Sequence, residues 1–375
     1  MKKLIYFTGI LFFLASCENF LDTENYTKKD DSNFPQSIED MQQIVTGIYA
    51  TLNLAGTNSY TTYYYLAELA SDDRFGGGGA GGKDQQGFDK FMNSSVDRMG
   101  AFWAARYKGI NRANYALEVI DQLDGYAVNQ KEHMLREIHF LRGFFYHELA
   151  EAFENVPLVL NTEAENLPQA DVEDLYGQIT YDLRKAIEIL DGNFTLETNR
   201  ITKWDAEALM ARVFLFYTGF YQTETLPLGD GEGNVVGSVT KDQVIAWLED
   251  CVFQSDRKLL PDFRSLWAYT NPYTAPYYKY LQENDPEVRW AGDGTAENTE
   301  KMFSISHTTM ATWNETGFSN AYALYFSHRT GGETTFPLSQ GWEQDRSLPD
   351  YGMNGKLRNQ MIFAGRHLSW MCMPN

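Results

Sequence analysis

The sequence LREIHFLRGFFYHELAEAFENVP, at residues 135–157, decides the fold. Its apolar residues recur at intervals of three and four, which places them on one face of an α-helix. These residues are Leu135, Ile138, Leu141, Phe145, Leu149 and Ala152. Pro157 disfavours helical geometry in the residue before it, so the helix, which starts near Gln130, is expected to end at Glu154-Asn155. Its wide apolar face needs neighbouring helices to cover it, as in the core of an all-α protein.

Other segments of the chain have the same helical periodicity. They are residues 37–52, 99–123, 172–190, 200–215 and 240–252. Ser37 and Asp40 are placed to cap the first of them. Each segment exposes an apolar face that only a neighbour can cover, which is typical of a helical-repeat scaffold. No strict repeat consensus is visible, so "tetratricopeptide-like" describes only the expected shape.

The composition argues against several classes of partner and chemistry. The chain has 375 residues, with 31 Lys and Arg against 51 Asp and Glu, and a formal net charge of −20. This balance argues against nucleic acids and anionic membrane surfaces as partners. The sequence has no Ser-His-Asp motif, zinc-protease motif, Rossmann fingerprint or Walker loop, so neither an enzyme nor a cofactor is indicated. The six histidines are scattered, and Cys251 and Cys372 form neither a disulfide framework nor a metal site.

The N-terminus has the features of an export signal. Two lysines precede an apolar run, from Leu4 to Leu14, that is too short to span a bilayer. Leu14-Ala15-Ser16-Cys17 resembles a bacterial lipobox, in which the cysteine becomes the acylated first residue of the mature protein. The other interpretation is an ordinary secretory signal followed by an incidental cysteine. We expect a signal peptide at residues 1–16, and a lipidated N-terminus and tether at residues 17–36.

Four motifs occur in a set order along the chain. They are NFLD at residues 19–22, WAARYKGINRAN at 103–114, RGFFY at 142–146 followed by VPL at 156–158, and RITK at 200–203 followed by ALMARVFL at 208–215. In this order they resemble motifs of the SusD/RagB family, the nutrient-binding outer-membrane lipoproteins of starch-utilisation-type systems. Glu154-Asn155 stands where that family usually has a glycine.

The resemblance covers residues 17–342 and implies both a fold and a function. The implied fold is mainly α, with a tetratricopeptide-like helical scaffold at residues 37–255 and an irregular, loop-rich region at 256–342 packed on it. Residues 300–305 look like a strand of that second region. The implied function is capture of oligosaccharides at the surface of the bacterial outer membrane. The implied partner is a SusC-like TonB-dependent outer-membrane transporter, to which the lipid-anchored protein passes its ligand.

The resemblance also places the ligand near the loop that follows ELASDD, at residues 68–73. The ligand-binding candidates that it carries over are Asp72, Asp73, Arg74 and Phe75. The glycine run at residues 76–82 is not a phosphate-binding loop, because it lacks a Gly-Lys-Ser/Thr ending and no strand is expected before it. The four aspartates at positions 72, 73, 84 and 89 could also hold Ca²⁺, but they lack the spacing of an EF-hand, so we expect solvated loop acids and assign no metal site.

Aromatic residues of the second region supply the other ligand-binding candidates. Pyranose faces are apolar and stack on aromatic rings, while polar side chains bind the hydroxyl groups. The candidates are Tyr273, Tyr277, Trp290 and Trp313. Most of the aromatic residues in this region are expected to be packed, with only a few touching the ligand.

Residues 343–375 do not continue the pattern. Gly341-Trp342 fits a GWG-x-GP segment of the family, and the resemblance stops there. Read one nucleotide out of phase, with permitted codon choices, the following residues can give a GP-x-P-x-LW-type continuation. We therefore expect an aberrant tail from a shifted reading frame, with no selected buried face and loose packing.

Three other functions stay open at this point. A glycoside hydrolase needs two carboxylates across a cleft, and the sequence has many acidic residues to supply them. The RagB branch of the family implies uptake of peptides. The helix pairs alone would also suit an assembly scaffold. Retention of a labelled glycan without turnover distinguishes a binding protein from an enzyme.

Overall fold

The computed structural model describes residues 34–54, 63–71, 74–76, 83–91, 99–189, 200–266, 283–285, 288, 298–305 and 345–347. Over these ranges the chain is mainly helical, which confirms the predicted fold class. The α-helices are α2 (Ile38–Leu54), α3 (Tyr63–Ala70), α4 (Lys83–Asp89), α5 (Gly100–Val119), α6 (Gln130–Phe153), α7 (Val172–Glu188), α8 (Lys203–Tyr221) and α9 (Lys241–Gln254). Among these described helices, none combines the length and hydropathy needed to cross a bilayer.

Short elements connect and flank the helices. The 3-10 helices η4 (Ile120–Gln122) and η5 (Phe263–Leu266) follow α5 and α9. Two antiparallel pairs of strands are described, β1 (Arg74–Gly76) with β4 (Asp345–Ser347) and β2 (Leu226–Gly229) with β3 (Val235–Val239).

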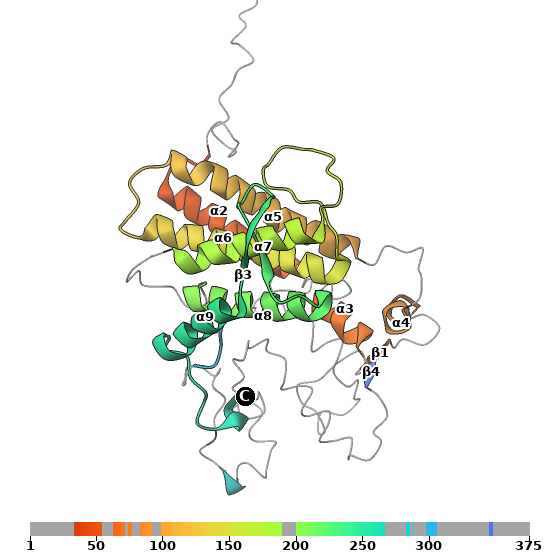
Figure 1. Ribbon diagram of the computed structural model, residues 1–375. Helices are drawn as coiled ribbons and strands as arrows, with labels where there is room; N and C mark the ends of the chain where they lie inside the picture. Colours follow the sequence, from red (N-terminus) through yellow and green to blue (C-terminus); the bar gives the residue numbers. More distant parts are fainter. Residues whose placement is uncertain are drawn as a thin grey trace, which may run out of the picture.

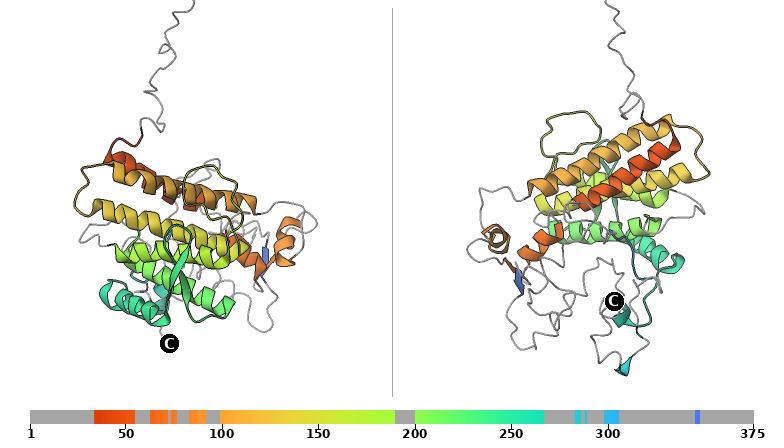
Figure 2. Two further views of the ribbon diagram at one scale, coloured as in Figure 1. Left: turned by 45° about the horizontal axis from the view of Figure 1, so that its top comes forward. Right: turned by 180° about the vertical axis from the view of Figure 1, so that it is seen from behind.

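The long helices form a layered array in which neighbours in sequence are neighbours in space. α2 packs on α5, and from α5 to α9 each helix packs on the next one in the chain. Figure 1 and the two views of Figure 2 show these helices stacked in successive layers, with α3, β1, α4 and β4 together at one side. This is the tetratricopeptide-like arrangement that the sequence predicts.

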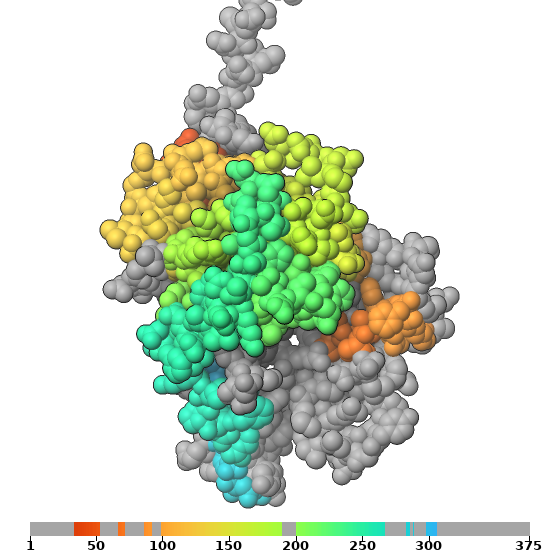
Figure 3. Space-filling model, viewed as in Figure 1, coloured from red at the N-terminus to blue at the C-terminus, as the bar shows by residue number. Residues whose placement is uncertain are grey.

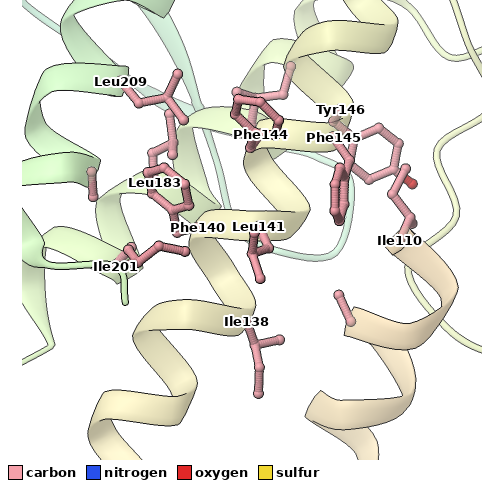
Figure 4. Close-up of a cluster of buried hydrophobic side chains, with 14 of the residues drawn as sticks. Ile110, Ile138, Phe140, Leu141, Phe144, Phe145, Tyr146, Leu183, Ile201 and Leu209 are labelled. Carbon is pink, nitrogen blue, oxygen red and sulfur yellow. The ribbon is translucent and has the colours of Figure 1, made fainter. Parts of the chain in front are cut away.

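Helix α6 is the centre of the array and contacts α2, α5, α7 and α8. Every residue from Arg136 to Ala150 is buried, so the buried surface is wider than the single apolar face that the sequence predicted. Figure 4 shows the rings of Phe144 and Phe145 between aliphatic side chains from the neighbouring helices. Leu135 and Ala152, at the two ends of the predicted face, are only half-buried.

Local sequence explains where the helices begin and end. The amide of Asp40 donates to Ser37 Oγ at 3.2 Å, so Ser37 caps α2 as predicted. Thr202 and Thr240 form capping boxes at the starts of α8 and α9. α6 ends at Phe153, close to the predicted position, and Glu154 then adopts a φ of 62°. Glycine is the residue that adopts such a φ without strain.

The predicted strand at residues 300–305 is wrong. This segment is described and pairs with no strand, and its neighbouring residues Met302 and Phe303 are both buried. A strand would turn successive side chains to opposite faces. The Phe303 ring instead packs edge-on against Phe140 and Phe144 of α6, at 5.1 and 5.5 Å between centroids. This part of the second region therefore adds a ring to the helical core.

Of residues 343–375, the structure describes Asp345–Ser347. Their strand β4 pairs with β1, with Arg74 opposite Ser347 and Gly76 opposite Asp345. The shifted reading frame stays a prediction, and so do the predicted boundaries between signal peptide, tether, scaffold and second region.

Candidate functional site

Most of the predicted ligand-binding residues lie outside the described ranges. These are Asp72, Asp73, Tyr273, Tyr277, Trp290 and Trp313, and the predicted anchor Cys17 lies outside them as well. Arg74 and Phe75 are adjacent in β1, where the structure describes their backbone. Their role in ligand binding therefore stays a prediction, but the structure shows where these two residues lie in the fold.

Strand β1 places this pair beside the helical array. β1 contacts α3, α4 and β4 (Figure 1). The expectation that no strand precedes the glycine run is wrong, because Arg74–Gly76 form β1 and α4 begins at Lys83. The three residues pair with a chain segment distant in sequence, which local periodicity does not reveal. A phosphate-binding loop is still not indicated, because Asp84 follows Lys83 where such a loop needs Ser or Thr.

A buried polar network joins three helices of the array, α5, α6 and α7. Arg142 of α6 donates to both carboxylate oxygens of Asp182 of α7, at 2.9 and 2.8 Å. His139 Nδ1 lies 2.8 Å from the same carboxylate, and Gln178 donates to it at 3.2 Å. Arg142 also donates to the side-chain oxygen of Asn114 of α5 at 2.9 Å. A bidentate ion pair of this kind fixes the orientation of both helices.

The network keeps its charges. Burial alone would raise the pKa of the Asp182 carboxyl, but Arg142 and His139 outweigh burial and lower that pKa below its ordinary value. Burial lowers the pKa of Arg142, and the Asp182 carboxylate more than reverses this. Both groups are therefore ionised across the physiological pH range, and the pair serves as a permanent link between α6 and α7.

The VPL segment after α6 is held by side chains of α5 and α6. Tyr107 Oη donates to the carbonyl of Pro157 at 2.7 Å. Asn114 donates to the carbonyl of Val159 at 2.9 Å, and Tyr146 Oη bonds to the same residue at 2.8 Å. The motif therefore has a structural explanation, because the loop leaving α6 is fixed to the two central helices.

A second buried ion pair joins α5 to α6. Arg106 Nε lies 2.5 Å from Glu148 Oε2, and the guanidinium lies over the Phe145 ring, 5.5 Å from its centroid. Burial raises the pKa of Glu148 despite the opposing effect of Arg106. Burial lowers the pKa of the neighbouring His147, which is therefore neutral at pH 7. These groups lie between packed helices, and we assign them a structural role.

Two carboxyl groups meet where α8 packs on α9. Glu207 is buried, and burial together with the charge of Asp250 raises its pKa to about 8. Lys203 Nζ lies 2.6 Å from Asp250 Oδ2, and this hydrogen bond lowers the pKa of Asp250. At neutral pH Glu207 therefore holds a proton while Asp250 is charged. Sequence reasoning singled out neither residue.

Sequence reasoning also missed Asp182, although a signal for it exists. Asp182 lies three residues after Ile179 and four before Ala186, which is the helical spacing that places it on the same face as these two buried residues. A charged residue on such a face is seldom buried without a partner. Within the described parts of the chain, no group of three or more His, Cys, Asp or Glu side chains is arranged to hold a metal ion.

Comparison with known proteins gives a consistent set of relatives. The SusD-like family model described as "Starch-binding associating with outer membrane" matches residues 19–215. SusD-like protein P25 of Formosa agariphila is 23% identical over 227 residues, which are 57% of this chain and 43% of that protein.

Solved structures share the fold. A laminarin binding SusD-like protein is 22% identical with a TM-score of 0.62, over 83% of this chain and 62% of that one. A structure with a xylogluco-oligosaccharide is 16% identical with a TM-score of 0.51, over 76% of this chain and 50% of that one. This chain spans less than two thirds of the length of each of these three relatives.

Proposed function

Because the chain belongs to the SusD-like family of starch-binding proteins associated with the outer membrane, we propose that it is a cell-surface lipoprotein that captures oligosaccharides. It passes them to a SusC-like TonB-dependent transporter. The observation that carries the proposal is the family match over residues 19–215, which begins two residues after the lipobox cysteine and extends into α8. No reaction is assigned to the protein, because the buried acids and bases described above link helices to one another.

The proposed ligand site lies around β1. Asp72, Asp73, Arg74 and Phe75 contribute polar groups and a ring to it, and the second region contributes Tyr273, Tyr277, Trp290 and Trp313. Aromatic rings stack on the apolar faces of pyranoses, while carboxylates and guanidinium groups bind their hydroxyls. The position of β1 beside a rigid helical array supports this assignment, because binding residues on loops and edges need a scaffold that holds them in place.

Calorimetry with the full chain tests the proposal. The probes are oligosaccharides prepared from laminarin and xyloglucan, with a pool of short peptides as a comparison. We expect binding of at least one oligosaccharide without hydrolysis. We also expect Phe75→Ala to weaken that binding about tenfold, as loss of a stacking ring does. Phe91→Ala, just after α4 and 79% exposed, is the matched control and should leave the affinity unchanged.

Three results would contradict the proposal. Hydrolysis of the probes would indicate a glycosidase, and binding of peptides alone would indicate a peptide-uptake protein. Recovery of protein partners with no affinity for oligosaccharide or peptide would indicate an assembly scaffold.

A further inference from the structure

The C-terminal end of α8 carries an aromatic surface that the proposed function does not use. The helix ends on FYTGFY, residues 216–221. Phe220 is 64% exposed, and the rings of Phe216 and Tyr221, which contact it, are half-buried. Single exposed apolar side chains are common on folded proteins, whereas rings that contact one another at the surface form a contiguous patch of the kind that marks an interaction site.

Other rings hold Phe220 in place. Its ring is parallel to that of Phe216 within 5°, at 5.7 Å between centroids. Phe216 is parallel within 12° to the buried ring of Tyr176 of α7. Tyr221 meets Phe220 edge-on at 4.9 Å. The exposed ring is thus backed by rings that reach into the core. Because it is already held in place, little conformational entropy is lost when a ligand stacks on it.

Gly219 leaves the helix surface open next to this ring. A Cβ built at this position would meet no heavy atom within 4 Å. Glycine weakens a helix relative to alanine, and neither packing nor a positive φ requires it here. The surface of α8 is therefore open at this one position, and Figure 3 shows this helix at the outer surface beside the β2–β3 hairpin.

Carboxylates border the aromatic surface. Burial raises the pKa of the Tyr221 phenol, and the nearby carboxylate of Glu154 raises it further. Burial and the charge of Glu173 likewise raise the pKa of the Tyr217 phenol. The Tyr221 hydroxyl therefore stays neutral and can donate or accept a hydrogen bond. Such a border suits a neutral ligand rich in hydroxyl groups and repels anionic ligands.

We propose that Phe220, Tyr221 and the open position at Gly219 form a second polysaccharide-binding surface. The apolar face of a pyranose matches the exposed ring, and its hydroxyls match the carboxylates and the phenol at the border. This inference rests on the proposed glycan-binding function, but it uses none of the residues assigned to the site around β1. A second surface strengthens binding to a long chain, because one polymer engages both surfaces at a high effective concentration.

Native electrophoresis of the full chain in gels containing laminarin or xyloglucan tests this surface. Phe220→Ala removes the ring, and Gly219→Gln adds a side chain at the open position, where a Cβ meets no heavy atom within 4 Å. We expect each variant to weaken the apparent affinity for the polymer by about tenfold or more. Phe253→Ala is the matched control, because this phenylalanine of α9 is 74% exposed, and we expect no change. Gly219→Gln should keep or raise the thermal midpoint, so its loss of binding is not a loss of folding.

The outcomes separate this inference from the proposed function. If the polymer retards both variants as much as it retards the wild type, the proposal of a second surface is wrong and the proposed function stands. An equal loss in Phe253→Ala would mean general adhesion to the polymer and would also overturn the surface. If calorimetry detects oligosaccharide binding but neither polymer retards the wild type, the second surface fails alone. If neither method detects binding, the function fails as well.

Discussion

At the scale of single residues, the contact between α5 and α6 depends on one large side chain and one missing side chain. Phe145 is fully buried. A Cβ at Gly109 would lie 2.5 Å from the Phe145 ring and 2.7 Å from Thr51 Oγ1. Real Cβ atoms do not approach this closely, so glycine at this position lets the two helices meet.

We predict that Phe145→Ala lowers the free energy of unfolding by about 3–5 kcal/mol, because it removes a buried ring and leaves a cavity. Leu215→Ala, at a position 69% exposed, should change that free energy by less than about 0.5 kcal/mol. Urea denaturation of both variants measures the difference. A loss below about 1 kcal/mol for Phe145→Ala would mean that the buried face of α6 is assigned wrongly.

Two glycines in helices should respond oppositely to the same substitution. Gly109→Ala forces a methyl group into the Phe145 ring, and we predict a loss of about 1–3 kcal/mol. Gly219→Ala meets open space and should gain about 0.5–1 kcal/mol from helix propensity. Thermal and urea denaturation of the pair give the comparison. A stabilising Gly109→Ala would show that α5 and α6 are farther apart than described.

At the scale of elements, buried charges link the helices more strongly than surface ones. Asp182→Ala leaves Arg142 buried without its carboxylate, and we predict a loss of about 3–5 kcal/mol. Glu188→Ala is the control on the same helix. It breaks the Arg184–Glu188 pair, which is 2.6 Å long but whose glutamate is 51% exposed, and should cost about 0.5 kcal/mol or less. Equal losses in the two variants would contradict the assignment of Asp182 as a link.

The contact between α8 and α9 should make stability depend on pH. Burial and the charge of Asp250 raise the pKa of Glu207 from 4.5 to about 8. Between these pH values the folded protein keeps a proton that the unfolded chain releases. The contribution of Glu207 to the free energy of unfolding is therefore fully present below pH 4.5 and is lost as the pH rises to about 8.

We predict that Glu207→Gln removes this part of the pH dependence of the free energy of unfolding, because glutamine stays neutral at every pH. The variant should gain stability relative to the wild type as pH rises from 5 to 9, by up to about 1.4 kcal/mol per pH unit. Urea denaturation across this range, with Glu188→Gln as an exposed control, measures the difference. A constant difference between variant and wild type at all pH values would mean that Glu207 titrates normally.

Apolar spacing predicted the helices because each one buries a face against its neighbour. α6 runs from Gln130 to Phe153, close to the predicted limits. α8 continues past the predicted end at Leu215, because its last aromatic residues pack on Tyr176 of α7. Spacing does not reveal pairing between distant segments, so β1 was missed. The strand wrongly expected at residues 300–305 came from the family resemblance and not from spacing. Nor does it reveal which charges are buried, since Arg142 and Asp182 are 40 residues apart.

At the scale of the whole molecule, the acidic balance bears on how the protein would be held at a membrane. A net charge of −20 disfavours electrostatic attraction to anionic lipid surfaces, and the proposed lipid anchor at Cys17 would supply the attachment instead. One acyl chain gives only weak, reversible attachment, whereas more than one gives stable attachment. We therefore expect the proposed anchor at Cys17 to decide where the protein is found.

We predict that Cys17→Ala releases the protein from the outer membrane into the soluble fraction. The apolar run ending in Leu14-Ala15-Ser16-Cys17 is the reason, because the cysteine stands where cleavage and acylation are expected. Membrane fractionation and mass spectrometry of the mature N-terminus measure the effect, and Cys251→Ala, which changes a buried thiol of α9, is the control that should stay on the membrane. Oligosaccharide binding by the released variant should equal that of the wild type, since the tether precedes the helical array. If Cys17→Ala still fractionates with the membrane, another part of the chain holds it there.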